Sequence, residues 1–322
     1  MNYVLRLGRT FAVAMLAAVA ATGARADNYP SSKITLVVAF APGGVADTLA
    51  RLIGQGLSEK LHQTVVVENR GGAGGNIAAG LVARAQPDGY TLLVTTTALA
   101  INATLHQTNP FKPEDFATVA IAASSPEALV TSPDNPAKDL ADLVRLAKGK
   151  PITFGSAGVG SGSHVEAEYF LKELAHVSAT HVPFQGGAPA ITAALGNHVD
   201  SLVLTLPPVT PHIRSGALRG LGVAAPKRNP AIPDVPTYGE MGYPNVYSQS
   251  WVGFFAPAKT PDAVVQKLNT EINALMKEQD SIDKLAKAGF EPVVKNLAET
   301  GAYFKSEVES WAKMVKAVGF SN

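Results

Sequence analysis

The sequence contains no cysteine in its 322 residues. This absence excludes disulfide bonds and thiolate chemistry. A domain outside the cytosol can do without disulfides when its chain is long enough to bury a sizeable core. Neither charge is in large excess, because 27 lysine and arginine residues stand against 26 aspartate and glutamate residues. That balance is not typical of a nucleic-acid-binding protein.

Motifs that hold nucleotide phosphates are missing. The pattern G-x-x-x-x-G-K-[ST] does not occur, and the segment GSAGVGSGS (residues 155–163) lacks the G-x-G-x-x-G spacing. The segment GGAGGNIAAG (residues 71–80) contains no lysine. A phosphate loop needs glycines for close approach of the backbone and a lysine for the phosphates. Nucleotide binding is therefore not expected.

Signatures of common hydrolases are missing too. Without G-x-S-x-G, the serines Ser156, Ser161 and Ser163 have no nucleophile elbow. Without H-E-x-x-H, the seven histidines have no zinc-protease arrangement, and no carboxylate motif supports His176 and His181, which are the nearest pair. The sequence thus predicts no catalytic residue, no metal site and no cofactor.

One long apolar run is present, near the N-terminus. It spans Phe11–Ala21, follows the basic residues Arg6 and Arg9, and precedes an A-x-A pattern that ends at Ala26. These features predict secretion and a signal peptide cleaved after Ala26. A retained membrane anchor is the alternative, but such an anchor needs about 20 apolar residues. Without residues 1–26 the chain keeps 24 basic and 26 acidic residues, a net charge near −2.

Short apolar runs alternate with segments of helical period along the rest of the chain. The runs are uniformly hydrophobic, which indicates strands that are covered on both faces. They are Ile34–Phe40, Val65–Val67, Thr91–Thr95, Val119–Ala122, Leu129–Thr131, Ile152–Phe154, His181–Pro183, Leu202–Thr205, Leu221–Ala224 and Val252–Phe255. The alternation predicts an α/β fold with mostly parallel sheets flanked by helices, and a chain of about 296 residues suits two lobes.

A unit of strand, glycine-rich turn and helix occurs twice. The first copy is VVAFAPGGVADTLAR (residues 37–51), and the second is ITFGSAGVGSGSHVEAEYFL (residues 152–171). Gly186 and Gly187 precede a further helix. Two lobes whose glycine-rich turns face each other would form a ligand cleft. We expect one lobe to comprise residues 27–126 and 251–322 and the other residues 127–250, with hinges near residues 125–127 and 249–252.

The first glycine-rich turn predicts an anion site. A helix N-terminus presents unpaired N–H groups and about half a positive charge, and glycine allows a ligand to approach the backbone closely. Gly43 and Gly44 are therefore candidates for holding an anion, although a simple helix entry is the alternative. Asp47 fits a capping role at the same helix start. His164 could donate a hydrogen bond to a ligand oxygen or simply cover a helix start.

Five ordered segments carry a resemblance to a known family. They are YPSSKITLVVAFAPGGVADTLARLI, VVVENRGGAGGNIAAGLVARAQPDGYTLL, HVPFQGGAPAITAALGNHVD, LRGLGVAAPKRNPAIPDVPTYGEMGYP and SWVGFFAPAKTP. With them the chain resembles the substrate-binding proteins of tripartite tricarboxylate transporters, also called the Bug family of periplasmic receptors. The resemblance covers essentially the whole chain after residue 26.

The resemblance implies two α/β lobes, joined by two crossing strands, that close on a ligand. It implies a monomeric periplasmic receptor, not an enzyme, that captures a small carboxylate for the membrane subunits of a transporter and uses no cofactor, metal or nucleic acid. It also implies that Asp200 could meet a polar or cationic ligand group. By position, the implied ligand contacts are Phe40, Ala41, Gly43, Gly44, Thr95, Thr96, Ser156, Gly158, Ser161, His164, Gln185, Gly186 and Gly187.

Some positions depart from the family pattern. Phe184 and Gln185 stand where relatives commonly have tyrosine and lysine, and Asn197 and His198 stand where a glycine-rich pair is usual. The second functional group of the ligand therefore stays open among aliphatic dicarboxylates, aromatic carboxylates and acidic amino acids. Two alternatives to transport also stay open: presentation of the ligand to a membrane sensor kinase, and hydrolysis in the periplasm.

Overall fold

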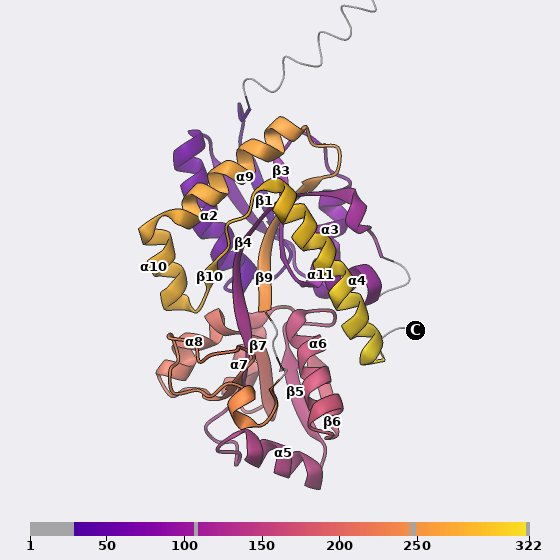
Figure 1. Ribbon diagram of the computed structural model, residues 1–322, viewed down its shortest axis with the longest axis vertical. Helices are drawn as coiled ribbons and strands as arrows, with labels where there is room; N and C mark the ends of the chain where they lie inside the picture. The colour runs from indigo at the N-terminus through magenta and orange to yellow at the C-terminus, as the bar shows by residue number, and fades with distance from the viewer. Residues whose placement is uncertain (1–28, 106–108, 245, 247–248, 320–322) are drawn as a thin grey trace, which may run out of the picture.

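The computed structural model describes residues 29–105, 109–244, 246 and 249–319, which form two lobes (Figure 1). This arrangement confirms the expected two-lobed α/β fold. The expected signal peptide lies outside the described residues, so its cleavage after Ala26 stays a prediction. Within the described part of the chain, no helix has the length and apolar character that crossing a membrane requires.

Ten described strands form one continuous sheet that passes through both lobes. Its main path runs β2-β1-β3-β9-β4-β7-β5-β6, while β8 and β10 also pair with β4. The strands are β1 (Ile34–Val38), β2 (Val65–Asn69), β3 (Thr91–Thr96), β4 (Phe116–Thr131), β5 (Ile152–Ser156), β6 (Ala179–Pro183), β7 (Ser201–Thr205), β8 (Arg219–Val223), β9 (Gln249–Pro257) and β10 (Glu291–Pro292).

Helices cover the sheet in both lobes (Figure 1). The first lobe carries α2 (Val45–Leu61), α3 (Asn76–Ala83), α4 (Ala98–Leu105), α9 (Asp262–Lys277), α10 (Gln279–Ala288) and α11 (Leu297–Ala317). The second lobe carries α5 (Leu140–Gly149), α6 (Gly162–Glu168), α7 (Gly187–Leu195) and α8 (Leu206–Arg214). Shorter pieces are η1 (Ala73–Gly75), η2 (Pro113–Asp115), η4 (Gly239–Met241) and η3 (Tyr169–Leu174), a π-helical continuation of α6.

Strand β4 crosses from one lobe to the other. The apolar pattern predicts two separate strands, Val119–Ala122 and Leu129–Thr131, but the structure has a single strand of 16 residues. Its first part pairs with β9 from Phe116 to Pro126, and its second part pairs with β7 and β8. Polar residues interrupt the apolar pattern where the strand passes between the lobes, and the ladder of hydrogen bonds continues through them.

The sheet combines parallel and antiparallel pairs. β1 is parallel to β2 and β3, and β5 is parallel to β6 and β7, as the strand–helix–strand pattern predicts. β9 is antiparallel to β3 in the first lobe, and β4 is antiparallel to β7 in the second. A strand that enters a lobe from the cleft must run against strands whose carboxyl ends point toward the cleft, so the crossing strands introduce the antiparallel pairs.

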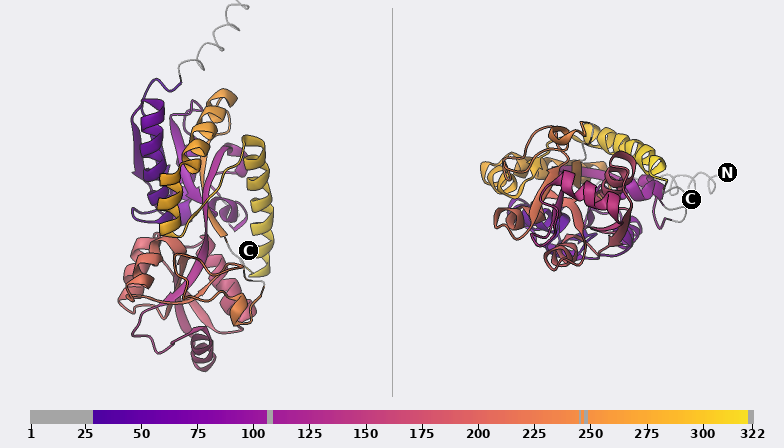
Figure 2. Two further views of the ribbon diagram at one scale, coloured as in Figure 1. Left: turned by 60° about the vertical axis from the view of Figure 1, so that its left-hand side comes forward. Right: turned by 90° about the horizontal axis from the view of Figure 1, so that it is seen from below.

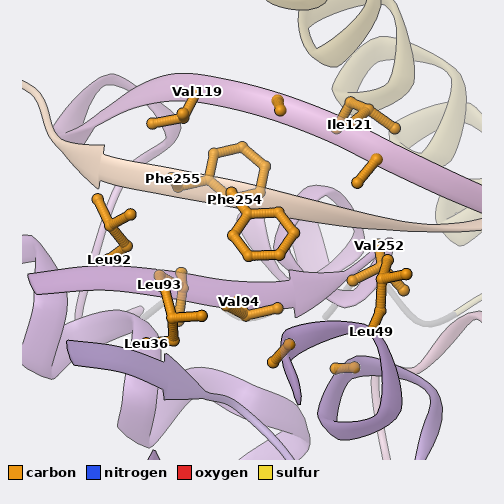
Figure 3. Close-up of a cluster of buried hydrophobic side chains, with 14 of the residues drawn as sticks. Leu36, Leu49, Leu92, Leu93, Val94, Val119, Ile121, Val252, Phe254 and Phe255 are labelled. Carbon is orange, nitrogen blue, oxygen red and sulfur yellow. The ribbon is translucent and has the colours of Figure 1, made fainter. Parts of the chain in front are cut away.

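A large hydrophobic cluster fills the first lobe. Leu36 of β1, Leu49 of α2 and Phe254 of β9 are among its buried side chains (Figure 3). Apart from Val165, this cluster draws on residues before 127 and after 250, whereas two further clusters draw on residues 128–246. The lobe boundaries expected at 126–127 and 250–251 stay a prediction.

Side-chain bonds fasten the crossing strands to the first lobe. Helix α11 lies along one side of that lobe and reaches the junction (Figure 2). The indole N–H of Trp251, in β9, donates to Oε2 of Glu307 at 2.7 Å, and the indole of Trp311 donates to the same oxygen at 3.1 Å. Oγ of Ser125, in β4, donates to the carbonyl of Gly289 at 2.8 Å. Up to these residues, both strands should move with the first lobe.

Candidate ligand-binding site

Two neighbouring hollows between the lobes share Phe40 and Ala157 in their linings. The smaller one, here called the hinge-side cavity, has a volume of about 40 Å³. It lies between helix starts of both lobes and the crossing strands. Its lining residues are Phe40, Gly44, Val45, Ala46, Thr96, Glu127, Ala157, Ser161, Gly162, Ser163, Gly187, Leu204, Thr205, Pro208 and Ser250.

The larger one, here called the rim-side hollow, has a volume of about 280 Å³. Glycine-rich loops of both lobes form most of its wall. Its lining residues are Phe40, Gly72, Ala73, Gly74, Gly75, Ala157, Gly158, Val159, Pro183, Phe184 and Gln185. A cleft lined by backbone and small residues from both lobes fits a ligand that is enclosed when the lobes approach each other.

The glycine-rich turn before α2 keeps its shape through Asp47. The buried carboxylate accepts hydrogen bonds from the backbone N of Gly43 at 2.9 Å, from Nε of Arg51 at 3.0 Å and from Nδ2 of Asn69 at 3.0 Å. Burial alone would raise the pKa of Asp47, but these bonds and the charge of Arg51 hold it below its usual value. Among the described contacts, Asp47 makes no capping bond to the helix. The predicted capping role is therefore corrected to a role in shaping the turn.

Helices α2 and α7 begin close together across the cleft. A Cβ atom built on Gly44 would lie 4.0 Å from the backbone N of Gly187. In the described part of the chain, no side chain caps the first turn of either helix. Because Gly44, Val45 and Gly187 line the hinge-side cavity, the positive ends of two helix dipoles and their uncapped N–H groups act on it.

Helix α6 begins at the same cavity but caps itself. Oγ of Ser161 accepts a hydrogen bond from the backbone N of His164 at 3.2 Å and donates to the carbonyl of Gly158 at 2.7 Å. Oγ of Ser163 accepts from the backbone N of Ala157 at 3.2 Å. These bonds fix the second glycine-rich turn and place two hydroxyl groups in the lining of the hinge-side cavity.

Loops of the two lobes touch at the rim of the cleft. A Cβ atom on Gly74 would overlap the carbonyl oxygen of Val159, and one on Gly160 would overlap Oδ1 of Asn102. Nδ2 of Asn102 also donates to the carbonyl of Gly74 at 3.0 Å. Such an approach requires glycine, because any side chain would occupy the space of the facing backbone. The cleft is therefore closed in this structure.

His164 and His181 stack beneath the second glycine-rich turn, with ring centroids 3.9 Å apart. Nδ1 of His164 accepts from the backbone N of Gly160 at 3.3 Å, and Nε2 of His181 lies 2.6 Å from Oγ of Ser156. Burial, with the nearby charges of His181 and Lys172, lowers the pKa of His164 to about 3, and burial with Lys172 lowers the pKa of His181 to about 4. Both rings are neutral at pH 7 and support the turn from below.

Several of the predicted contact residues meet at the two hollows. Those that line the hinge-side cavity are Phe40, Gly44, Thr96, Ser161 and Gly187. Gly158 and Gln185 line the rim-side hollow. Ala41 and Gly186 lie against each other in the facing turns, since a Cβ on Gly186 would come within 3.4 Å of the backbone N of Ala41. Gly43 donates to Asp47 in the same first-lobe turn.

The remaining predicted residues lie behind the cleft. Thr95, Ser156 and His164 are buried, and they are not among the described residues that line either hollow. The structure does not bring Asp200 to the cleft. Its carboxylate accepts hydrogen bonds from the backbone N of Thr153 at 2.7 Å and from Oγ1 of Thr153 at 2.8 Å. Asp200 therefore joins β5 to the start of β7.

Sequence reasoning missed an acid in the hinge-side cavity. Glu127 lies where β4 passes between the lobes, is 1% exposed and lines the cavity. Burial raises the pKa of Glu127 well above its usual value, and the neighbouring Glu166 raises it further. The available signal was a lone acidic residue in the otherwise uncharged run AIAASSPEALVT (residues 120–131). Ser163, Thr205 and Ser250 also line the cavity without having been predicted.

Residues 49–320 match the family described as the tripartite tricarboxylate transporter family receptor. The chain belongs to this receptor family. BugT of Bordetella pertussis strain Tohama I is 34% identical to it over 300 residues, which cover 91% of each chain. The resemblance expected from the five ordered segments is thereby confirmed.

Solved structures give this receptor the same fold. Rpa4515 of R. palustris, solved with adipate, superposes with a TM-score of 0.87 at 34% identity and covers 90% of this chain and 98% of its own. MatC from Rhodopseudomonas palustris, solved with bound malate, superposes with a TM-score of 0.83 at 32% identity and covers 89% of this chain and 100% of its own. Adipate and malate, with which these two neighbours were solved, are both small dicarboxylates.

We predict that Gly74→Ala holds the lobes apart. Its methyl group would overlap the carbonyl of Val159, and the φ of +61° adds backbone strain. Small-angle scattering should show a larger radius of gyration than for the parent. Gly216→Ala is the control, because Gly216 has a φ of +75° and nothing within 4 Å of a built Cβ. Equal radii for parent and Gly74→Ala would contradict a rim contact made by these loops.

We predict that the stacked histidines destabilise the fold in acid. Their folded-state pKa values of about 3 and about 4 lie below the unfolded value of 6.5. At a pH between the folded and unfolded pKa values, the unfolded chain therefore binds more protons than the folded chain. The free energy of unfolding should fall as pH drops below about 6.5, by up to about 1.4 kcal/mol per pH unit for each proton. Urea unfolding at several pH values should show a shallower fall for His181→Phe. An unchanged slope would count against this role.

Proposed function

We propose that this protein is a periplasmic receptor that captures a small carboxylate between its lobes and delivers it to the membrane subunits of a tripartite tricarboxylate-type transporter. It acts by binding alone, as a monomer, without a cofactor and without chemical change of the ligand. The family assignment supports the transport role, because receptors of this family are named for such transporters. Structures of neighbours with adipate and malate support a carboxylate as the ligand class.

The observation that carries this proposal is the pair of uncapped helix starts at the hinge-side cavity. The first turns of α2 and α7 offer N–H donors and dipole charge to a small anion. Hydroxyl groups of Thr96 and Thr205 line the same space and can donate further hydrogen bonds. No lysine, arginine or histidine is among the described lining residues. A carboxylate would therefore be held by fixed dipoles and hydrogen bonds.

A hydrolase is a poorer fit to this cleft, although Ser156 and His181 are close enough to form a nucleophile–base pair. Ser156 is fully buried, and its hydroxyl also accepts a hydrogen bond from the backbone N of Gly158 at 3.1 Å. The ring of His181 is stacked between Phe154 and His164. Neither Ser156 nor His181 is among the described lining residues of the two hollows. A nucleophile must be able to reach its substrate. Ser156 and His181 instead lie behind the cleft, where they support the second glycine-rich turn.

Ligand entry requires the lobes to separate. A volume of about 40 Å³ accommodates on the order of three water molecules, which is less than a dicarboxylate occupies. Opening by rotation about residues 125–127 and 249–252 would keep both lobes intact, because the described side-chain bonds fasten β4 and β9 to the first lobe at Ser125 and Trp251. Residues 27–126 with 251–322, and residues 127–250, would then move as the two bodies.

We predict that Gly44→Asp folds normally and loses carboxylate binding. Gly44 is the N-cap of α2 and has a φ of −83°. Aspartate is favoured at an N-cap and stabilises the helix by a few tenths of a kcal/mol relative to glycine. The new carboxylate would bond the N–H groups intended for the ligand and repel it. Calorimetric titration with malate and adipate should show a loss of at least about a hundredfold.

Gly44→Ala is the matched control for that test. A Cβ at this position meets the carbonyl of Ala41 at 3.5 Å and the backbone N of Gly187 at 4.0 Å, which are ordinary contacts. This variant should bind within a few fold of the parent. The parent should be stabilised by about 2.7 kcal/mol at a ligand concentration of a hundred times Kd. If Gly44→Asp binds as tightly as Gly44→Ala, the start of α2 does not hold the ligand.

A further inference from the structure

One oxygen of the Glu127 carboxyl group is unpaired among the residues that the structure describes. Among the described residues, nothing forms a hydrogen bond with Oε2 of this buried side chain. The other oxygen, Oε1, lies beside the start of α6, since a Cβ built on Gly162 would come within 3.1 Å of it. Leaving a buried carboxyl oxygen unpaired is unfavourable, because the group gives up its hydrogen bonds to water. A partner supplied by the ligand would remove this penalty in the complex.

Among the described residues, the ionisable groups that interact with Glu127 are acidic. Glu166, on α6, raises the pKa of Glu127, and the hydroxyl of Tyr238, in the segment before η4, interacts electrostatically with both carboxyl groups. No basic side chain is among the described residues of the cavity lining. The floor of the hinge-side cavity near β4 therefore favours positive charge, whereas the starts of α2 and α7 favour negative charge.

We infer that Glu127 binds an ammonium group of the ligand, so that the cavity selects small carboxylates that also carry an amine. The inference rests on the proposed function, because the helix starts are taken to hold the carboxylate of the same ligand. An ammonium group has three N–H donors and no acceptor. Oε2 of Glu127 can take one donor, and the hydroxyl groups of Thr205 and Ser250, which line the same cavity, can take the others.

A second carboxylate fits this position poorly. The ionised form of Glu127 would repel it, so it could bind only while Glu127 holds a proton, whereas an ammonium group pairs with the ionised form. A hydroxyl group on the ligand could satisfy Oε2 but would leave the acidic surroundings without a counter-charge. Specificity for an amino carboxylate over a dicarboxylate of similar length would thus arise from repulsion as well as attraction.

The sign of the pH dependence distinguishes the two kinds of ligand. In the unliganded protein, burial and the neighbouring Glu166 raise the pKa of Glu127, so its protonated form is favoured compared with an exposed glutamate. An ammonium group favours the ionised form, so its binding releases a proton and its affinity rises with pH. A second carboxylate favours the protonated form, so its affinity falls as pH rises. An aliphatic amine stays charged throughout the range from about pH 5 to about pH 8.

The experiment compares matched four-carbon probes by calorimetric titration. The probes are the 2-, 3- and 4-aminobutyrates, with butyrate, 2-hydroxybutyrate and succinate as counterparts without an amine. Each is titrated into the parent, Glu127→Gln and Glu114→Gln, which removes an exposed carboxylate as a control. The thermal midpoint of each variant verifies folding, and the titrations of parent and Glu127→Gln are repeated at pH 5, 6.5 and 8.

We expect an aminobutyrate to bind the parent at least about tenfold more tightly than butyrate or succinate, with affinity that rises with pH. Glu127→Gln should lose at least about tenfold of that affinity and its pH dependence, and Glu114→Gln should change neither. The inference is overturned if succinate binds the parent more tightly than the aminobutyrates do, or if Glu127→Gln binds an aminobutyrate as tightly as the parent does. Either result leaves the proposed function, capture of a carboxylate, unaffected. If none of these probes binds the parent, and malate and adipate do not bind it either, the proposed function itself is overturned.

Discussion

The antiparallel pairing of β4 with β9 is the interaction on which the rest of the structure depends. The two strands pair from Phe116 opposite Pro257 to Pro126 opposite Gln249, with two shifts of register on the way. Among the described strands, β4 then carries the sheet into the second lobe, where it pairs with β7 and β8. The helix starts of both lobes converge where this pair leaves the first lobe. The same pair brings Glu127 and Ser250 to the cavity lining, so the strands at the proposed hinge also form part of the proposed binding site.

Close approach of backbone to backbone explains the glycine-rich loops. Gly74 faces the carbonyl of Val159. A Cβ atom placed on Gly44 would lie 4.0 Å from the backbone N of Gly187. A receptor that encloses its ligand needs surfaces that come together without side chains between them. Asp47 and the stacked histidines supply the rigidity that such loops lack, because their hydrogen bonds and ring contacts fix the turns from the buried side.

Electrostatics in the cleft rely on dipoles and buried acids instead of basic side chains. Fixed N–H groups attract an anion and need no counter-ion of their own, so they can be buried without the desolvation cost of an unpaired charge. Glu127 is different, because burial favours its neutral form and one of its oxygens has no hydrogen-bond partner in the described part of the chain. The stability given up at this position is consistent with a binding role, since functional groups are commonly held in unfavourable surroundings until the ligand arrives.

Local sequence patterns determined the α/β class, the strands near Ile34 and Ile152, and the glycine-rich turns at Gly43–Gly44 and Gly186–Gly187, because hydrophobic period and glycine act over a few residues. The tertiary structure alone decided that Val119–Ala122 and Leu129–Thr131 belong to one strand and that Asp200 bonds Thr153. It also decided that Glu127 lies beside Gly162. These outcomes depend on distances between residues far apart in the chain, which are fixed by the packing of whole lobes and not by any local pattern.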